Sequence, residues 1–157
     1  MPYALSDLIK KFSHERYVGI IIFGAADGGK TTYMQKFTRL HPDLKIYYLD
    51  VQEKVAAQSD TSFILQLTPR KFLDWIFQFL PSQPVDACII DHFDFMFNLW
   101  DTVKKEDFLN RFTRIERVIF PKPFIAILQS DPILENVIEK NITNPRSIYR
   151  FEDLEEI

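Results

Sequence analysis

A glycine-rich stretch near the start of the chain has the residue types and spacing needed to hold a phosphate chain. An apolar run from Val18 to Phe23 leads into Gly24, and Gly28-Gly29-Lys30-Thr31 follows after three further residues. Glycine suits a loop in which φ turns positive and the backbone N–H groups converge on a phosphate. The pattern G-x-x-x-x-G-K-[ST], between an apolar run and a helical segment, is that of a P-loop. All 4 glycines lie in this strand and loop, so the pattern does not reflect a glycine-rich composition.

The motif predicts how its residues bind ATP and Mg²⁺. Lys30 brings a positive charge to the β and γ phosphates, and Thr31 offers its hydroxyl to the metal ion. The following helix adds the positive end of its dipole. The expected nucleotide-binding residues are Gly24, Ala25, Ala26, Asp27, Gly28, Gly29, Lys30, Thr31 and Thr32.

A second apolar strand ends in a carboxylate that suits the same metal ion. Residues 88–90 are apolar and Asp91 follows them. This arrangement is typical of a Walker B strand, whose aspartate holds the water shell of Mg²⁺. We therefore predict that Thr31 and Asp91 are the metal-binding side chains.

The residue after this aspartate leaves hydrolysis open. ATPases with this layout usually have a glutamate here that orients the attacking water, whereas this chain has His92. A neutral His92 can position a water molecule, and Glu53 and Asp94 are substitutes by residue type. The alternative is that each of them is a solvated loop residue.

Two later segments place further polar groups where a γ-phosphate would be sensed. The apolar run 123–128 ends in Gln129 and Ser130, which either face the nucleotide or cap the next helix. Arg146 and Arg150 flank the last expected strand, and a guanidinium can fork onto phosphate oxygens as an arginine finger. The candidate catalytic residues are Asp91, His92, Gln129, Arg146 and Arg150.

Strands and helices are expected to alternate along the chain and position these residues. The expected strands are 18–23, 45–50, 62–67, 85–91, 123–128 and 147–151, and the expected helices are 5–12, 30–40, 69–80, 107–118 and 132–140. The strands are continuously apolar, as a sheet covered on both faces requires. We therefore predict a three-layer α/β fold with a mainly parallel sheet, in a single domain over residues 1–157. Its N-terminal helix, within residues 1–16, packs on the sheet.

Composition limits the environment and the partners. The net charge is −3, there is 1 Cys, and no apolar run approaches the ~20 residues of a membrane span, so we expect a cytoplasmic protein with no membrane partner. Nucleic acid would be bound only through a local patch or within a complex. One face of the expected helix 107–118 has three arginines, Arg111, Arg114 and Arg117. This face is either exposed to solvent or in contact with the phosphate groups of a nucleic acid. The aromatic segment 92–100 is either core or an interface.

The order of these elements resembles the nucleotide-binding core of AAA+ ATPases. The P-loop, Walker B strand and polar-tipped strand are followed by residues 146–154, which are similar to the clamp-loader-type ending S-R-C…R-F…L but one residue shorter. Residues 46–50 also resemble a RecA-type strand, although Gln52 stands where that type has its glutamate. The chain stops at Ile157, where AAA+ proteins normally continue into a helical lid, so no lid is expected.

Among small P-loop proteins, the sequence resembles the BrxF family of BREX phage-defence systems in its length, its P-loop and the missing lid. The resemblance implies an ATP-binding switch or ATPase component of a larger assembly, either a homo-oligomer or a complex with a larger ATPase. Two alternatives remain at this point. One is a small nucleotide or metabolite kinase, since residues 27–32 resemble the thymidylate-kinase loop. The other is a scaffold that binds ATP without hydrolysing it.

Overall fold

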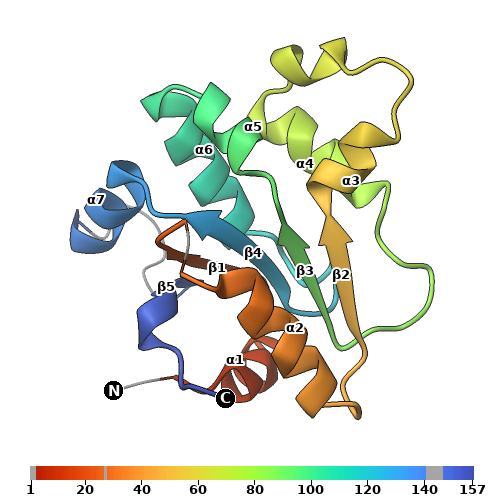
Figure 1. Cartoon of the computed structure of the whole chain (residues 1–157), viewed down its shortest axis with the longest axis vertical. Helices are drawn as coiled ribbons and strands as arrows, with labels where there is room; N and C mark the ends of the chain where they lie inside the picture. Colours follow the sequence, from red (N-terminus) through yellow and green to blue (C-terminus); the bar gives the residue numbers. More distant parts are fainter. Residues whose placement is uncertain (1–2, 27, 141–146) are drawn as a thin grey trace.

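The computed structural model describes residues 3–26, 28–140 and 147–157, and a five-stranded sheet lies at its centre (Figure 1). The strands are β1 (Gly19–Gly24), β2 (Ile46–Asp50), β3 (Ala87–Asp91), β4 (Phe124–Gln129) and β5 (Ile148–Arg150). The helices are α1 (Leu5–Phe12), α2 (Lys30–Leu40), α3 (Val51–Ala56), α4 (Pro69–Phe77), α5 (Asp94–Leu99), α6 (Thr102–Thr113) and α7 (Pro132–Lys140), with 3₁₀ turns η1 (Ser62–Gln66) and η3 (Phe151–Asp153). None of these described helices is long and apolar enough to cross a membrane.

The sheet has the strand order β2-β3-β4-β1-β5, and every neighbouring pair is parallel. Helices α1 and α2 pack on one face, and α4, α5, α6 and α7 pack on the other (Figure 1). Strand β4 lies between the P-loop strand β1 and the Walker B strand β3. The prediction of a three-layer α/β P-loop NTPase fold is therefore confirmed, with a sheet that is parallel throughout the described residues.

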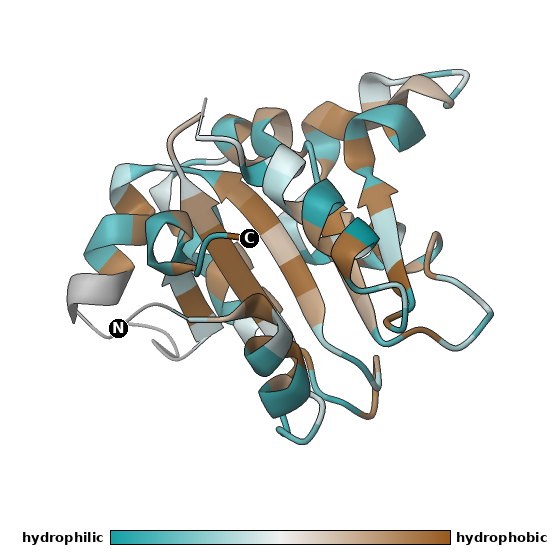
Figure 2. Ribbon diagram, turned by 60° about the horizontal axis from the view of Figure 1, so that its bottom comes forward, coloured by the Kyte–Doolittle hydropathy of each residue, from teal (hydrophilic) through white to brown (hydrophobic). Residues whose placement is uncertain are grey.

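Consecutive residues of the central strands enter opposite cores. Ile20 and Ile22 of β1 face α1 and α2, whereas Ile21 and Phe23 face the layer that contains α6. Because both faces are covered, both sets of side chains are apolar, and the strands are coloured as hydrophobic along most of their length (Figure 2). This explains why the sequence shows continuous rather than alternating apolar runs.

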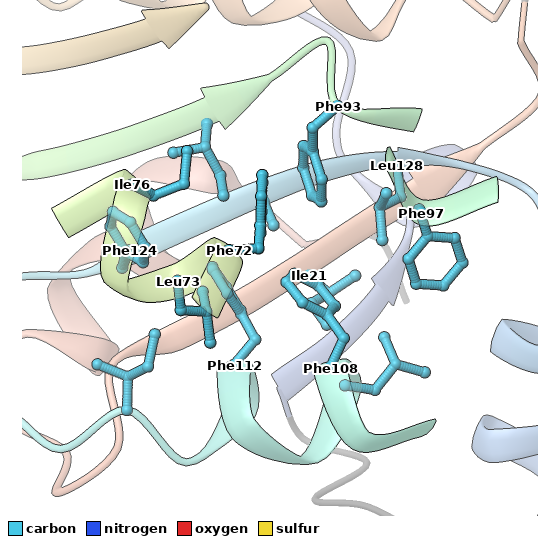
Figure 3. Close-up of a cluster of buried hydrophobic side chains, with 14 of the residues drawn as sticks. Ile21, Phe72, Leu73, Ile76, Phe93, Phe97, Phe108, Phe112, Phe124 and Leu128 are labelled. Atoms are coloured by element: carbon cyan, nitrogen blue, oxygen red, sulfur yellow. The ribbon is translucent and has the colours of Figure 1, made fainter. Parts of the chain in front are cut away.

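Aromatic side chains fill the layer between the sheet and helices α4, α5 and α6 (Figure 3). Phe72 stacks on Phe93 with ring centroids 5.5 Å apart, and Phe112 stacks on Phe124 at 5.2 Å. The buried residues of the segment 92–100 are Phe93, Met96, Phe97 and Trp100, each at most 5% exposed. Of the two interpretations of this segment, the core is the correct one for these four residues.

Three local predictions differ from the structure. Residues 62–66 form a 3₁₀ helix instead of a strand. Helix α6 begins at Thr102 instead of residue 107, because Asp101 caps it by accepting from the Lys104 N–H at 2.9 Å. The last residue of α6 is Thr113, so Arg114 and Arg117 lie beyond the helix and do not share a helical face with Arg111.

Gly19 is required where α6 crosses β1. A Cβ atom at this position would lie 1.8 Å from the backbone oxygen of Phe112. We expect Gly19→Ala to lower the free energy of unfolding by about 3 kcal/mol, because a backbone atom cannot move aside as a side chain can. Urea denaturation measures this change. Leu65→Ala, at a side chain that is 77% exposed, is the control and should change stability by less than about 0.5 kcal/mol. A Gly19→Ala variant as stable as that control would contradict the close packing.

Candidate functional site

The last residues of the five strands meet at one edge of the sheet. They are Gly24, Asp50, Asp91, Gln129 and Arg150. Since all the strands are parallel, their carboxyl ends lie together, and ligands of open α/β sheets bind at this edge. The topology thus gathers four of the predicted site residues and adds Asp50, which was not among them.

The P-loop connects β1 to α2 and holds Lys30 against its own backbone. The Nζ atom of Lys30 donates to the carbonyl oxygen of Gly24 at 3.0 Å and to that of Ala25 at 2.5 Å, and the residue is 7% exposed. The N–H of Gly28 donates to the Ala25 carbonyl at 3.0 Å, which closes a turn in the loop. Gly29 has φ +83°, a conformation that favours glycine, and α2 begins directly after it.

The other described residues of the loop differ in how far they are exposed. Exposed positions are occupied by Ala25, Ala26, Gly28, Gly29 and Thr32, while Thr31 is half-buried in the first turn of α2. The open side of the loop is therefore accessible to a ligand. Two predicted site residues, Asp27 and Arg146, lie outside the described residues.

A direct hydrogen bond joins the P-loop to the Walker B strand. The hydroxyl of Thr31 donates to Oδ2 of Asp91 at 2.6 Å, and Asp91 is 3% exposed. A hydroxyl and a carboxylate at this spacing are hard oxygen donors of the kind that Mg²⁺ prefers. Mg²⁺ needs only one or two protein side chains, because phosphates and waters fill its other positions. The donor set fits the predicted metal, and within the described part of the chain no group of three or more His, Cys, Asp or Glu residues forms a separate metal site.

Tyr48 of β2 also forms a hydrogen bond with Asp91, and this contact was not predicted from the sequence. Its hydroxyl donates to the same Oδ2 atom of Asp91 that accepts from Thr31. Burial and this hydrogen bond raise the pKa of Tyr48, so the phenol remains a donor at neutral pH. No pattern within either strand predicts this contact, because it depends on the register of β2 beside β3. In that register Tyr48 lies opposite Ile89 and Asp50 opposite Asp91, so Tyr48 lies on the same face of the sheet as Asp91.

His92 follows Asp91 in an uncommon backbone conformation. Its φ is 60°, and it is the one residue other than glycine with positive φ among those described. Its N–H donates to Oδ1 of Asp91 at 2.8 Å, and its Nε2 lies 3.5 Å from Oγ1 of Thr31. Its Nδ1 lies 3.0 Å from Oδ2 of Asp50, within ion-pair distance but without hydrogen-bond geometry. The ring thus lies between two carboxylates, beside the predicted metal ligands.

The polar end of β4 lies next to the P-loop strand. Gln129 is in register with Gly24, its backbone N–H donates to Oδ1 of Asp94 at 2.7 Å, and its side chain is exposed. Burial raises the pKa of Asp94, and the positive charge of Lys30 opposes the shift. Glu53, the other carboxylate considered, is exposed on α3, where its N–H donates to Asp50.

Arg150 lies on the opposite side of the P-loop from Asp91, in a cavity of about 440 Å³. Gly24, Ala25 and Gly28 line the same cavity. One guanidinium nitrogen of Arg150 donates to Oε2 of Glu135 at 2.6 Å. The structure therefore places Arg150 beside the P-loop of its own chain and pairs it with a carboxylate of α7.

Neither protein-family models nor curated proteins match this sequence. One similar solved structure is that of Drosophila ORC bound to DNA, at 15% sequence identity and a TM-score of 0.45. The match covers 93% of this chain and 40% of that chain.

Proposed function

We propose that this protein binds ATP with Mg²⁺ and works as a nucleotide-dependent switch or ATPase component of a larger assembly. The observation that supports it best is the 2.6 Å hydrogen bond between Thr31 and Asp91, which joins the two halves of a P-loop metal site. Lys30 stands at the start of α2, where the helix dipole also attracts phosphate. Arg150 and the exposed end of β4 offer further polar groups on the nucleotide side of the sheet.

The assembly that we propose is of the BREX phage-defence type, in which the chain would act as a BrxF-like subunit. The resemblance of the P-loop region supports this assignment. Its partner would be a second copy of the chain or a larger ATPase, and nucleic acid would be contacted through the complex. Co-purification of the tagged chain from its native host, with the genomic neighbours identified, tests the assignment.

We expect the isolated protein to hydrolyse ATP slowly. His92 occupies the place of a water-orienting glutamate. Its ring is held close to other side chains, with Nδ1 3.0 Å from Asp50 and Nε2 3.8 Å from Asp91, so it is not free to orient an attacking water molecule. The same observation favours a second candidate function, a scaffold that uses bound ATP only as a conformational switch. Phosphate release with and without the partner distinguishes the two.

Lys30 provides the first test. Lys30→Met keeps the aliphatic stem in its buried position and removes the charge, so we expect the dissociation constant for ATP to rise at least tenfold, by the loss of one or two charge-assisted hydrogen bonds. Calorimetry measures the change. In the wild type, ATP at 100 times its dissociation constant should stabilise the fold by about 2.7 kcal/mol.

Lys10→Ala is the matched control, because this lysine is exposed on α1 and its loss should leave ATP affinity unchanged. Melting of each variant without nucleotide shows whether it is folded. A folded Lys30→Met variant that binds ATP like the wild type would remove the P-loop assignment.

A further inference from the structure

The position of His92 suggests which divalent cation this site selects. Two ligands that bind one metal ion at about 2.1 Å and at right angles lie roughly 3 Å apart. The Nε2 atom of His92 lies 3.5 Å from Oγ1 of Thr31 and 3.8 Å from Oδ2 of Asp91. An ion that binds beside Thr31 would therefore lie within reach of the imidazole after the ring shifts by roughly 0.5 to 0.8 Å.

Asp50 sets which nitrogen of the ring faces the ion. Its carboxylate lies 3.0 Å from Nδ1, within ion-pair distance but without hydrogen-bond geometry. The negative charge of this carboxylate still favours the tautomer with the proton on Nδ1, which leaves the lone pair on Nε2, the nitrogen nearer Thr31 and Asp91. A carboxylate that accepts from the outer nitrogen is the usual partner of a metal-binding imidazole, and a rotation of the ring on metal binding would complete that bond.

The backbone conformation supports the same role. A residue other than glycine at φ 60° is uncommon, and such residues are often found at functional sites, where the surrounding structure holds them. Here the N–H of His92 donates to Oδ1 of Asp91 at 2.8 Å. This bond ties the strained residue to the metal-binding carboxylate and fixes where the ring projects.

We propose that His92 binds the nucleotide-associated divalent cation directly through Nε2, with Asp50 as its positioning residue. The proposal rests on the proposed ATP site. An imidazole raises the affinity for Mn²⁺ and Co²⁺ more than for Mg²⁺, which demands oxygen ligands and near-ideal octahedral geometry. The site therefore favours Mn²⁺ or Co²⁺ over Mg²⁺ more strongly than a P-loop site built only from oxygen donors does, while still binding Mg²⁺.

Pulsed electron paramagnetic resonance of Mn²⁺ with ADP tests the direct bond. The full-length wild-type complex should show a ¹⁴N coupling to Mn²⁺, and His92→Ala should lose it. His41→Ala is the control, because His41 ends α2 and stacks on Phe37 at 4.2 Å, away from the site, so this variant should keep the coupling. A coupling that survives in a folded His92→Ala variant would come from another nitrogen and would overturn the proposal.

Metal titrations test the selectivity. The dissociation constant for Mn²⁺ is measured in the presence of ADP. It should rise by about 10- to 100-fold in Asp50→Asn, the range seen when an outer partner of a metal ligand is lost, and at least tenfold in His92→Ala. The dissociation constant for Mg²⁺ should rise less in both variants. Asparagine still caps α3, so Asp50→Asn should remain folded. A wild-type complex that binds Mn²⁺ and ADP but shows no ¹⁴N coupling overturns this inference alone, whereas a wild type that binds no ADP overturns the proposed function.

Discussion

A His92→Glu variant is expected to hydrolyse ATP about 10² to 10⁴ times faster than the wild-type protein, the range that a general base contributes. Glutamate would place a carboxylate where we expect the attacking water, next to the proposed metal ligands Thr31 and Asp91, which are hydrogen-bonded to each other. Release of inorganic phosphate, measured in single-turnover and steady-state experiments, gives the two rates. His92→Gln is the matched variant, because glutamine has the shape of glutamate without its basicity and should not accelerate the reaction.

The neighbours of His92 decide how this test must be built. Asp50 lies 3.0 Å from the imidazole and Asp91 precedes it, so a glutamate adds a third negative charge to the site. The double variant His92→Glu with Asp50→Asn removes one of the two neighbouring charges, which lowers the repulsion, and should show the larger rate. A wild-type turnover of a few per second in the purified chain would contradict the premise that histidine is a poor substitute here.

The sequence was sufficient to predict the fold and the strand, turn and helix around Gly29 because both depend on local patterns. A continuous apolar run followed by Gly24, Gly29 and Lys30 specifies a buried strand, a turn with positive φ and a helix start within one short segment. The alternation of such runs with helical segments then specifies a covered parallel sheet. Neither inference requires knowledge of which strands are neighbours.

Contacts between strands could not be predicted in the same way. The contact of Tyr48 with Asp91 and that of Asp50 with His92 depend on β2 lying beside β3 in one register, which no pattern within either strand encodes. The predicted start of α6 was wrong for a different reason. Six polar or weakly apolar residues of the helix precede its first buried side chain, Phe108, so apolar periodicity located only the buried part of the helix. The capping residue Asp101 was the signal for the true start.

Replacing the arginine finger, for which Arg146 and Arg150 are the candidates, with alanine is expected to lower the rate of ATP hydrolysis in the assembled complex by a factor of about 10³ to 10⁵. The affinity for the nucleotide should change little. An arginine finger acts on charge that develops in the transition state, and it can belong to the same chain or to a neighbour. Arg150 shares a cavity with Gly24 and Ala25, so we expect it to act on the nucleotide of its own chain. Arg146 is the candidate for a neighbouring site. Phosphate release by the assembly, compared with ATP affinity from calorimetry, measures both effects.

The pairing with Glu135 provides a further control for Arg150. Its guanidinium donates to this carboxylate at 2.6 Å, so Arg150→Ala also leaves Glu135 without its partner. Glu135→Gln removes the ion pair while keeping the arginine, and should leave hydrolysis intact or raise it. A loss of activity in Glu135→Gln equal to that in Arg150→Ala would mean that the ion pair, rather than the arginine, matters.

Mixing each arginine variant with Lys30→Met then separates action within a chain from action between chains. A mixed interface pairs the intact P-loop of the arginine variant with the intact arginine of the Lys30→Met chain. If Arg146 acts on a neighbouring copy, its mixture recovers hydrolysis, whereas an Arg150 that acts on its own chain recovers none, because no single chain holds both groups. Recovery in the Arg150 mixture would contradict its placement in the cavity beside its own P-loop. If the partner is a different, larger ATPase, neither mixture recovers activity until that partner is added.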